Sequence, residues 1–563
     1  MKNKKTMTKS TILFILISLL FGQTVAQDTI RSEQELLYNG IKLPAQWPPR
    51  TGNPKSAVPM KVPYLINPPS IIPIDIGRQL FVDDFLIAKT TLKRTYHTAR
   101  KLDQNPVFYA ETKYEHNPAG TPEPGQRDVT YLGHGGLFYD FDEQLFKMFY
   151  TAGWRGGLAL ATSKDLINWN RPDLCLVDQN IILPPGWLNA GGDNAVWLDS
   201  QTENADEKFK FLTDRGTHKK ENRMSHTLHI SKNGRIWSQG LSTSRADDYC
   251  SFFYNPFRDK WVFSIKKEGL GRARWYAESD DFLAGRNWDD AVFWVNADAL
   301  DKPDPEVGDP AQLYSLNAVA YESIILGEFY IHLGPNNSIA HKGKFPKITE
   351  LKLGFSRDGF HWSRPDRRPF INATRQEGDW DRAYLHGTMG VCLVMGDELW
   401  FPYCGYSGTT DDGYQGMYTA ASIGFATLRR DGFASMGAGN KAGELTTNPV
   451  TFSGKYLFVN IDCPAGELLV EISDEHGKEI EPFNFKNCIP TRVDETLHQI
   501  EWKSKADLSQ LAGTPVRFRF RLTNGELYAF WVSSNLNGAS NGYLAAGGPG
   551  YDGIIDTKGK DAN

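Results

Sequence analysis

The chain has 563 residues, 40% of them hydrophobic, and a formal net charge of −5 at neutral pH. This length predicts about two to four domains with enough apolar residues for their cores. The mild negative charge excludes a basic surface for nucleic acid, so we expect no nucleic-acid partner. The 15 tryptophans, 23 tyrosines, 32 phenylalanines and 52 glycines are typical of β-rich folds with tight turns.

The first 26 residues have the three parts of a secretory signal peptide. Residues 2–9 contain four lysines, residues 12–21 are apolar, and Thr24-Val25-Ala26 precedes a cut at Gln27. The apolar run is too short for a transmembrane anchor, which needs about 20 residues. No later stretch of the sequence is long and apolar enough to span a bilayer. We therefore expect a periplasmic or secreted protein without membrane insertion.

The six cysteines do not predict a metal site. None lies in C-x-x-C spacing, so no zinc site is expected. Cys463 and Cys488 are the first pair to test for a disulfide, and buried free thiols are an equally good interpretation. We expect no cofactor, and a structural calcium ion stays an open alternative.

A repeat decides the predicted fold of the central part of the chain. Residues 27–73 are rich in proline and are expected to form an extended arm. After them, Ser163-Lys-Asp-Leu-Ile-Asn-Trp169 recurs in altered form, and each copy follows two strand-like segments. The further copies are residues 231–237, 279–288, 356–362 and 430–433. Five units of roughly 50 to 75 residues predict a five-bladed β-propeller over residues 74–440.

Two further features complete the predicted architecture. A strand from Ile74 to Ile87 is expected to close the propeller, because closure removes an exposed sheet edge. Residues 445–540 hold short strands joined by turns, which predicts a structural β-sandwich. Within it, residues 516–522 alternate between apolar and charged side chains, as a strand with one buried face does. Residues 541–563 are rich in glycine and are expected to be a flexible tail.

The segment from Phe146 to Trp169, Phe-Lys-Met-Phe-Tyr-Thr-Ala-Gly … Leu-Ala-Leu-Ala-Thr-Ser-Lys-Asp-Leu-Ile-Asn-Trp, closely matches the first blade of propeller glycoside hydrolases. With the sandwich, the chain resembles the invertase and fructanase family. The propeller alone is similar to the arabinanase and xylosidase family and to the anhydro-galactosidase family. The invertase motifs Asn-Asp-Pro, Arg-Asp-Pro and Glu-Cys are absent, so the chain looks like a divergent member whose catalytic residues cannot be transferred by motif.

The resemblance implies an active site in the funnel where the innermost strands begin. Hydrolysis of a glycosidic bond needs a proton donor and a base or nucleophile. We expect Asp193 and Asp248 to form the carboxylate pair, since each precedes an inner strand. Glu322 is the candidate acid, because shielding by aromatic walls would raise its pKa. His386 is an alternative acid, as in the anhydro-galactosidase family, where a histidine has this role.

Four further residues are expected to bind substrate: His134, Arg215, Tyr314 and Trp187. Each has a simpler structural interpretation as well. An aspartate before a strand often only forms a turn, and Arg215 beside Asp214 also fits a surface ion pair. Arg272, Arg375 and Arg382 are possible contacts for an acidic sugar, although solvation at the surface is the favoured interpretation for each.

The sequence therefore predicts an exported glycoside hydrolase that acts on a plant or algal oligosaccharide or polysaccharide. A non-catalytic carbohydrate-binding propeller is the main alternative, and a propeller lyase or phosphorylase is a third. An enzyme needs two carboxylates, or a carboxylate and a histidine, facing each other at the axis. A binding protein would present aromatic rings and amides there.

Overall fold

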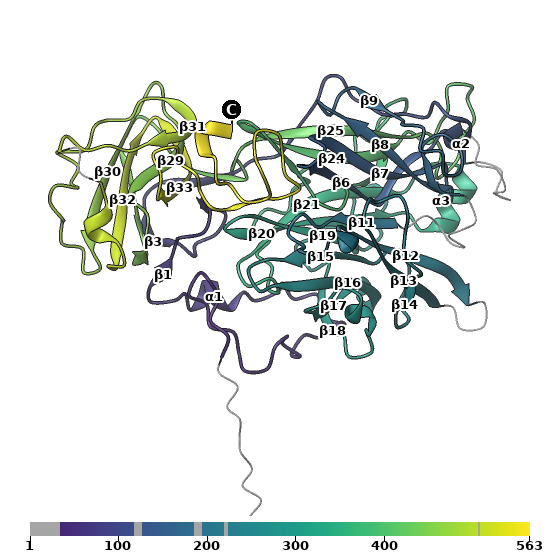
Figure 1. The fold of residues 1–563 in the computed structure, drawn as a ribbon, viewed down its shortest axis with the longest axis horizontal. Coiled ribbons are helices and arrows are strands. Elements are labelled where there is room, and N and C mark those ends of the chain that lie inside the picture. The colour runs from purple at the N-terminus through teal and green to yellow at the C-terminus, as the bar shows by residue number, and fades with distance from the viewer. Residues whose placement is uncertain (1–33, 117–125, 185–193, 219–222, 505–506, 563) are drawn as a thin grey trace, which may run out of the picture.

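The computed structural model describes residues 34–116, 126–184, 194–218, 223–504 and 507–562. Figure 1 shows a large body made of strands β6 to β25 and a smaller body that contains β29 to β33. The described helices are short: α1 (Pro63–Ile66), α2 (Lys113–His116) and α3 (Asn337–Gly343). The expected all-β class is confirmed. The predicted signal peptide lies outside the described residues.

The large body contains five successive antiparallel units in the described chain. Units one and two consist of β6 (Thr130–Asp140), β7 (Leu145–Ala152), β8 (Gly157–Ser163), β9 (Trp169–Asn170) and β10 (Ile181–Leu183), then β11 (Asn194–Leu198), β12 (Phe209–His218), β13 (Arg223–Ser231) and β14 (Leu241–Ser242). Units three to five consist of β15 (Ser251–Asn255), β16 (Lys260–Gly269), β17 (Gly271–Ser279) and β18 (Val292–Asn296), then β19 (Gln312–Glu322), β20 (Ile324–Gly334) and β21 (Ile348–Ser356), then β22 (Ala383–His386), β23 (Leu393–Met395), β24 (Glu398–Tyr406) and β25 (Ala421–Arg429).

The five units form a ring around their first strands. β6 pairs with β11 in parallel at Gly135 and Ala195, and β11, β15 and β19 then follow one another. In the fifth unit, β22 contacts β21 on one side and β6 on the other. The Met389 N–H donates to the His134 carbonyl at 2.8 Å, which joins the fifth unit to the first. The starts of the first strands therefore meet near one axis.

The repeated segments form one kind of polar turn. At residues 163–169, the Ser163 hydroxyl accepts the Leu166 N–H at 2.9 Å, and the Trp169 indole donates back to the Leu166 carbonyl at 2.9 Å. The turn beginning at Ser356 repeats the first of these contacts, since its hydroxyl accepts the Gly359 N–H at 2.9 Å. These tryptophans therefore have a structural role.

The expected closing strand is wrong. Residues 79–80 and 87–90 form β2 and β3, and both pair with strands of the smaller body. The ring is instead completed by β5 (Arg100–Lys101), which pairs with β25. The chain continues along that edge, where the N–H groups of Leu102 and Val107 each donate to β25 carbonyls at 3.0 Å. This segment covers the last edge, so the physical reason for closure stands, but other residues provide it.

The smaller body consists of two sheets that share one apolar core. One contains β1 (Ile72–Pro73), β28 (Val450–Thr451), β32 (Val516–Thr523), β27 (Gly443–Thr447), β3 (Ile87–Thr90) and β30 (Glu467–Asp474). The other contains β31 (Asp494–Gln499), β29 (Tyr456–Asp462), β33 (Gly525–Ser533), β26 (Ala434–Ala438), β4 (Lys93–Tyr96) and β2 (Gln79–Leu80). In β32 buried and half-buried residues alternate, as its sequence predicts.

The smaller body is built from both ends of the chain. The Phe81 ring lies 6.4 Å from Phe520 of β32 and 5.7 Å from Phe530 of β33, so a residue from the N-terminal region packs between the two sheets. In Figure 1 the purple strands β1 and β3 lie beside the yellow-green strands of this body. Residues 445–540 alone therefore lack part of their core.

The N-terminal arm packs on the third and fourth units of the ring. The Tyr38 hydroxyl donates to the Ser323 carbonyl at 2.5 Å, and the Asn39 amide donates to the Arg357 carbonyl at 2.8 Å. Glu35 accepts from Arg258 at 2.9 Å.

None of the helices in the described part of the chain has the length and apolar character needed to cross a bilayer. All six cysteines are free thiols, including Cys463 and Cys488.

The C-terminal segment is ordered, contrary to expectation. Its strand β34 (Tyr543–Leu544) pairs with the end of β19. The Ala546 N–H donates to the Cys392 carbonyl at 3.0 Å, and the Ala546 carbonyl accepts from Tyr139 at 2.9 Å. The segment thus bonds to three units at the ends of their first strands. Figure 1 shows this yellow segment lying where the two bodies meet.

A buried charge cluster joins these parts. Arg78 Nη1 lies 2.9 Å from Asp431 Oδ2, and Arg430 Nη2 lies 3.2 Å from Glu322 Oε1 and 3.4 Å from Asp556 Oδ2. All five side chains are 4% exposed or less. Burial raises the pKa of Glu322, whereas at Asp431 burial is outweighed by the two guanidinium groups, which lower its pKa. The cluster connects the N-terminal region, β19, the turn after β25 and the C-terminal segment.

We predict that Arg78→Met destabilises the protein by about 3–5 kcal/mol, because carboxylates remain buried without that cation. The control Arg492→Met removes an exposed partner of Glu467, with 62% of the Arg492 side chain exposed, and should cost ~1 kcal/mol or less. Urea midpoints and calorimetric melting temperatures measure both effects. A loss no larger than that of the control would contradict a connecting role for the cluster.

Candidate functional site at the ring axis

A cage of tyrosine rings surrounds His386 where the first strands begin. Tyr249 directly precedes β15, Tyr314 lies near the start of β19, and Tyr384 and His386 belong to β22. The ring centroids of the tyrosines lie 4.3–6.5 Å from that of His386. These tyrosines are Tyr131, Tyr249, Tyr314, Tyr330, Tyr384 and Tyr406. Units one, three, four and five all contribute to this cage.

The hydroxyl of Tyr249 fixes the protonation of His386. It donates to the Gly133 carbonyl at 2.6 Å and also contacts His386 Nδ1. A hydroxyl has one proton, so when that proton goes to Gly133, Nδ1 must carry its own proton and donate to the Tyr249 oxygen. This assigns the unprotonated, hydrogen-bond-accepting nitrogen to Nε2. Nε2 is buried and has no hydrogen-bond partner among the described residues.

Three residues at these strand starts have strained backbones. Asp128, before β6, has φ 57°, Tyr249 has φ 62°, and Tyr384 has φ 54°. Bulky side chains rarely adopt left-handed values, and each such residue costs of order 1–3 kcal/mol. Such strain gathers at functional sites. Asp128 is also engaged by His116, whose Nδ1 lies 2.7 Å from its carboxylate.

Three cations lie around the Tyr314 ring. The Nζ atoms of Lys266 and Lys347 are 5.5 and 5.3 Å from its centroid, and the guanidinium carbon of Arg272 is 5.4 Å away. Each distance permits a cation–π attraction. Lys347 Nζ also lies 4.4 Å from the Tyr384 centroid and donates to the Tyr418 hydroxyl at 3.2 Å.

Asp248 is an ionised carboxylate at this entrance. Lys266 forms an ion pair with it. Burial alone would raise the pKa of Asp248, but Lys266, Arg272 and Lys347 together outweigh burial, so its pKa lies below the ordinary value. Its side chain is 39% exposed, which leaves it accessible to a ligand. Asp248 therefore has the protonation state of a base or nucleophile.

The histidines of the site are neutral. Burial, reinforced by Lys347, lowers the pKa of His386 well below its ordinary value. Burial and the charge of Arg272 do the same at His332, whose ring lies 5.9 Å from that of Tyr314. Burial lowers the pKa of His134 to about 3. A neutral imidazole is a poor proton donor at pH 7, so His386 does not have the state of a general acid.

Glu328 lies deeper in the ring and is uncharged at neutral pH. Burial raises its pKa to about 8, and its carboxyl group forms no ion pair within the described chain. A Cβ added to Gly387 would lie 1.9 Å from Glu328 Oε2, so only glycine lets the carboxyl group lie this close to the residue after His386. The sequence analysis did not single out Glu328, because this residue lies in the second strand of its unit rather than the first.

The structure brings together four of the residues that the sequence singled out. The His386 ring lies 5.6 Å from that of Tyr314, and Asp248 is bound to Lys266, whose Nζ lies 5.5 Å from the same Tyr314 ring. His134 lies beside Tyr249 with a centroid distance of 4.1 Å. Asp193 and Trp187 fall outside the described residues. Arg215 belongs to β12, and its side chain is not among those described.

The candidate acid Glu322 is wrong. It ends β19, ten positions after Gln312 begins that strand, and so lies at the opposite end of the ring from Asp248. Its oxygens accept from Ser540 at 2.7 Å and from Arg430 at 3.2 Å. Burial does raise its pKa, as expected, but within the charge cluster between the bodies rather than in a funnel.

The sequence analysis missed most of the polar residues at the entrance. Lys266 and Arg274, which were missed, lie on the two strands of one hairpin, and the alternation of Arg274 with Arg272, which was considered as a sugar contact, was the available signal. Lys347, 1% exposed, precedes β21 and carries no such signal. Among the described residues, no group of histidine, cysteine, aspartate and glutamate side chains has an arrangement that would hold a metal ion.

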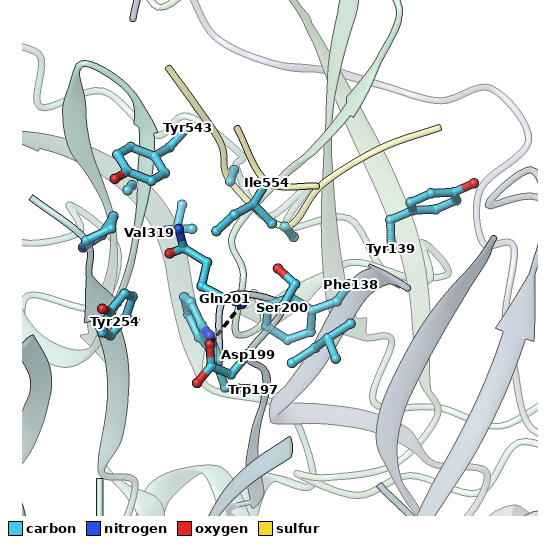
Figure 2. A pocket seen from close by; sticks show the side chains of 15 residues that line it. Phe138, Tyr139, Trp197, Asp199, Ser200, Gln201, Tyr254, Val319, Tyr543 and Ile554 are labelled. Atoms are coloured by element: carbon cyan, nitrogen blue, oxygen red, sulfur yellow. Dashed lines mark hydrogen bonds between the residues drawn. The ribbon is translucent and has the colours of Figure 1, made fainter. Parts of the chain in front are cut away.

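A hollow lies at the opposite ends of the first strands. Figure 2 shows Tyr254, Gln201 and Tyr543 around it, with Ile554 of the C-terminal segment above. Burial raises the pKa of Asp199 at its edge, and Lys210 Nζ lies 3.3 Å from that carboxylate. The cations and the tyrosine cage are at the other end, so we place the candidate site at the entrance.

Comparisons with known proteins give only distant likenesses. No protein-family model matches the chain, and no curated protein matches it. Among solved structures, an N-acetylgalactosamine deacetylase from F. plautii is 14% identical over 58% of this chain and 97% of its own, with a TM-score of 0.41. A family 43 arabinoxylan arabinofuranohydrolase from Bacillus subtilis is 10% identical over 78% and 99%, with a TM-score of 0.34.

A third likeness is to a fructofuranosidase from Schwanniomyces occidentalis, 10% identical over 75% of this chain and 98% of its own, with a TM-score of 0.31. The last two belong to the groups of glycoside hydrolases that the sequence resembles. At these TM-scores the likenesses carry no inference about the activity of this chain.

We predict that stability falls steeply as the pH drops from about 6.5 to 4.5. His134, His226, His332 and His386 stay neutral in the folded protein, whereas the unfolded chain takes up their protons below pH 6.5. Glu328, with its raised pKa, opposes this by one proton across the same window. The net slope is at most ~4 kcal/mol per pH unit.

Urea unfolding at several pH values measures that slope. His226→Gln should flatten it by ~1.4 kcal/mol per pH unit, since one buried histidine is removed. His476→Gln is the control, because 84% of that side chain is exposed, and it should leave the profile unchanged. Equal stability at pH 6.5 and pH 4.5 would contradict the prediction.

Proposed function

We propose that the protein is a glycoside hydrolase whose active site is the entrance of the ring, with the five units as blades of a β-propeller and the smaller body as a β-sandwich. One observation carries the proposal: an ionised, accessible carboxylate stands beside a cage of tyrosines at the point where the first strands meet. Tyrosine rings stack on the apolar faces of sugars, and polar groups at their edge orient the hydroxyls.

Asp248 is the proposed base or nucleophile of the reaction. Its ionised state suits attack on the sugar or activation of water. With Glu322 outside the entrance, Asp193, the other member of the expected carboxylate pair, becomes the proposed proton donor, since in the sequence it directly precedes β11, the first strand of the neighbouring unit. Lys266 holds Asp248 in place and keeps it charged.

His386 is proposed to hold the sugar rather than to transfer a proton. With Nδ1 bonded to the Tyr249 oxygen, Nε2 is an acceptor without a partner in the described chain. A buried acceptor without a partner is costly, and a sugar hydroxyl can satisfy it. His134 packs against Tyr249 of the cage, and Tyr314 of the cage packs against His386.

A non-catalytic carbohydrate-binding protein is the second candidate. Asp248 forms an ion pair with Lys266, one of the three cations around Tyr314, and aromatic rings form most of the site. That composition favours binding if no second acid completes the pair. Both candidates share an exported location, proposed from residues 1–26, and a glycan ligand, and neither needs a cofactor.

We predict that Asp248→Asn lowers turnover of a cleaved glycan by at least about a hundredfold, the low end for loss of a general base. Asparagine has nearly the same shape, so folding should change little. Release of reducing ends from a panel of plant and algal glycans, including arabinans, xylans, fructans and galactans, identifies the substrate and measures the effect.

Asp289→Asn is the matched control, because Asp289 is exposed and lies in a turn outside the strands of the ring. It should keep the parental rate. If Asp248→Asn keeps full activity, Asp248 is not catalytic. If no glycan is cleaved while one binds at the entrance, the binding protein is the correct alternative.

A further inference from the structure

We propose that the entrance binds a sugar with a negatively charged substituent, the carboxylate of a uronic acid or a sulfate ester, and that Arg272 is its main contact. This inference rests on the proposed glycan site and names the class of its ligand. It follows from the positions of the cationic side chains around Tyr314.

Positive charge is concentrated at one point of the entrance. Lys266, Arg272 and Lys347 all lie within 5.5 Å of the Tyr314 centroid. Their charges act together on both Asp248 and His332. Like charges this close repel one another, and a bound anion removes that repulsion.

Arg272 is oriented toward a ligand. Its Nη1 donates to the Gln312 side-chain oxygen at 2.9 Å, and its backbone N–H donates to the same oxygen at 3.2 Å. The guanidinium is thereby held over Tyr314 while remaining partly exposed. It forms no ion pair with a carboxylate of the described chain. A planar guanidinium fixed in this way binds carboxylate or sulfate oxygens through two parallel hydrogen bonds.

The other cations at the entrance have different roles. Lys266 is bound to Asp248, and Lys347 is buried against Asn337 and Tyr418. Arg274 is fully buried and donates to the Tyr249 carbonyl at 2.7 Å, with no carboxylate against it in the described residues. These cations raise the electrostatic potential around Arg272 and leave its guanidinium group available to a ligand. A neutral sugar offers nothing to offset them, whereas an anionic sugar does.

Binding to matched oligosaccharide pairs tests the inference. Oligogalacturonides, alginate oligomers and glucuronoxylan oligomers are each compared with their carboxyl-reduced forms, and sulfated galactan oligomers with their desulfated forms. Isothermal titration calorimetry on the full-length mature protein should show roughly tenfold or tighter binding of the anionic member of one pair. High ionic strength should weaken that binding. The pair that responds tells carboxylate from sulfate.

Arg272→Gln should weaken binding of the anionic oligosaccharide by roughly tenfold and leave the affinity for the neutral member of the pair unchanged. Arg235→Gln, which removes an exposed arginine from the turn at residues 231–237, is the matched control and should change neither. Equal affinity for both members of every pair, absence of binding to every anionic oligosaccharide, or an Arg272→Gln variant with parental affinity would each overturn the inference.

The same ligands separate this inference from the proposed function. Tight binding of an anionic oligosaccharide without its cleavage supports the inference and contradicts the hydrolase. Cleavage of neutral glycans only, with no preference for an anionic ligand, supports the hydrolase and overturns the inference.

Discussion

The hydroxyl of Tyr249 is the interaction on which the entrance depends. Tyr249 precedes the first strand of unit three, donates to Gly133 of unit one, and touches His386 of unit five. Its carbonyl accepts from Arg274 of the same unit. One residue in a strained left-handed conformation therefore connects three of the five units at their common axis. It also sets which nitrogen of His386 faces the site, so structure and proposed chemistry share this one contact.

The two chain ends hold the opposite side of the molecule. The N-terminal region supplies strands to both bodies, and the C-terminal segment bonds to three units, through β34 at the end of β19 and through Ala546 at Tyr139 and Cys392. Arg78 and Asp556 bring these ends to the same buried charge cluster as Glu322. Buried ion pairs are weak sources of stability, but losing one partner is costly. The cluster therefore makes correct docking of both ends a condition of folding, while the entrance stays free for a ligand.

How far the sequence predicted the structure depended on the range of the interactions. The repeat and the apolar alternation are local, so the units and the strands of residues 456–533 could be anticipated. The closing strand at Arg100–Lys101 is two residues long and has no pattern. Glu322 was expected at the entrance, but β19 begins at Gln312 and runs for 11 residues, so Glu322 lies at the other end of that strand. The glycine-rich composition of the C-terminal segment predicted flexibility. The Ser540 hydroxyl, however, donates to Glu322 and Asp556, which are remote from Ser540 in the sequence, and these bonds hold the segment in place.

The residues at the entrance lower the stability of the folded protein, and this cost indicates that they serve to bind a ligand. Three cations around one ring, a buried histidine nitrogen without a partner in the described chain and three left-handed residues each oppose stability. Elsewhere in the ring, apolar residues fill the sheets at no such cost. An anionic sugar would satisfy several of these groups at once, since its charge offsets the cations, its hydroxyls reach His386 and its ring stacks on tyrosine. The features that lower the stability of the protein without a ligand are therefore the ones that would strengthen its binding of such a ligand.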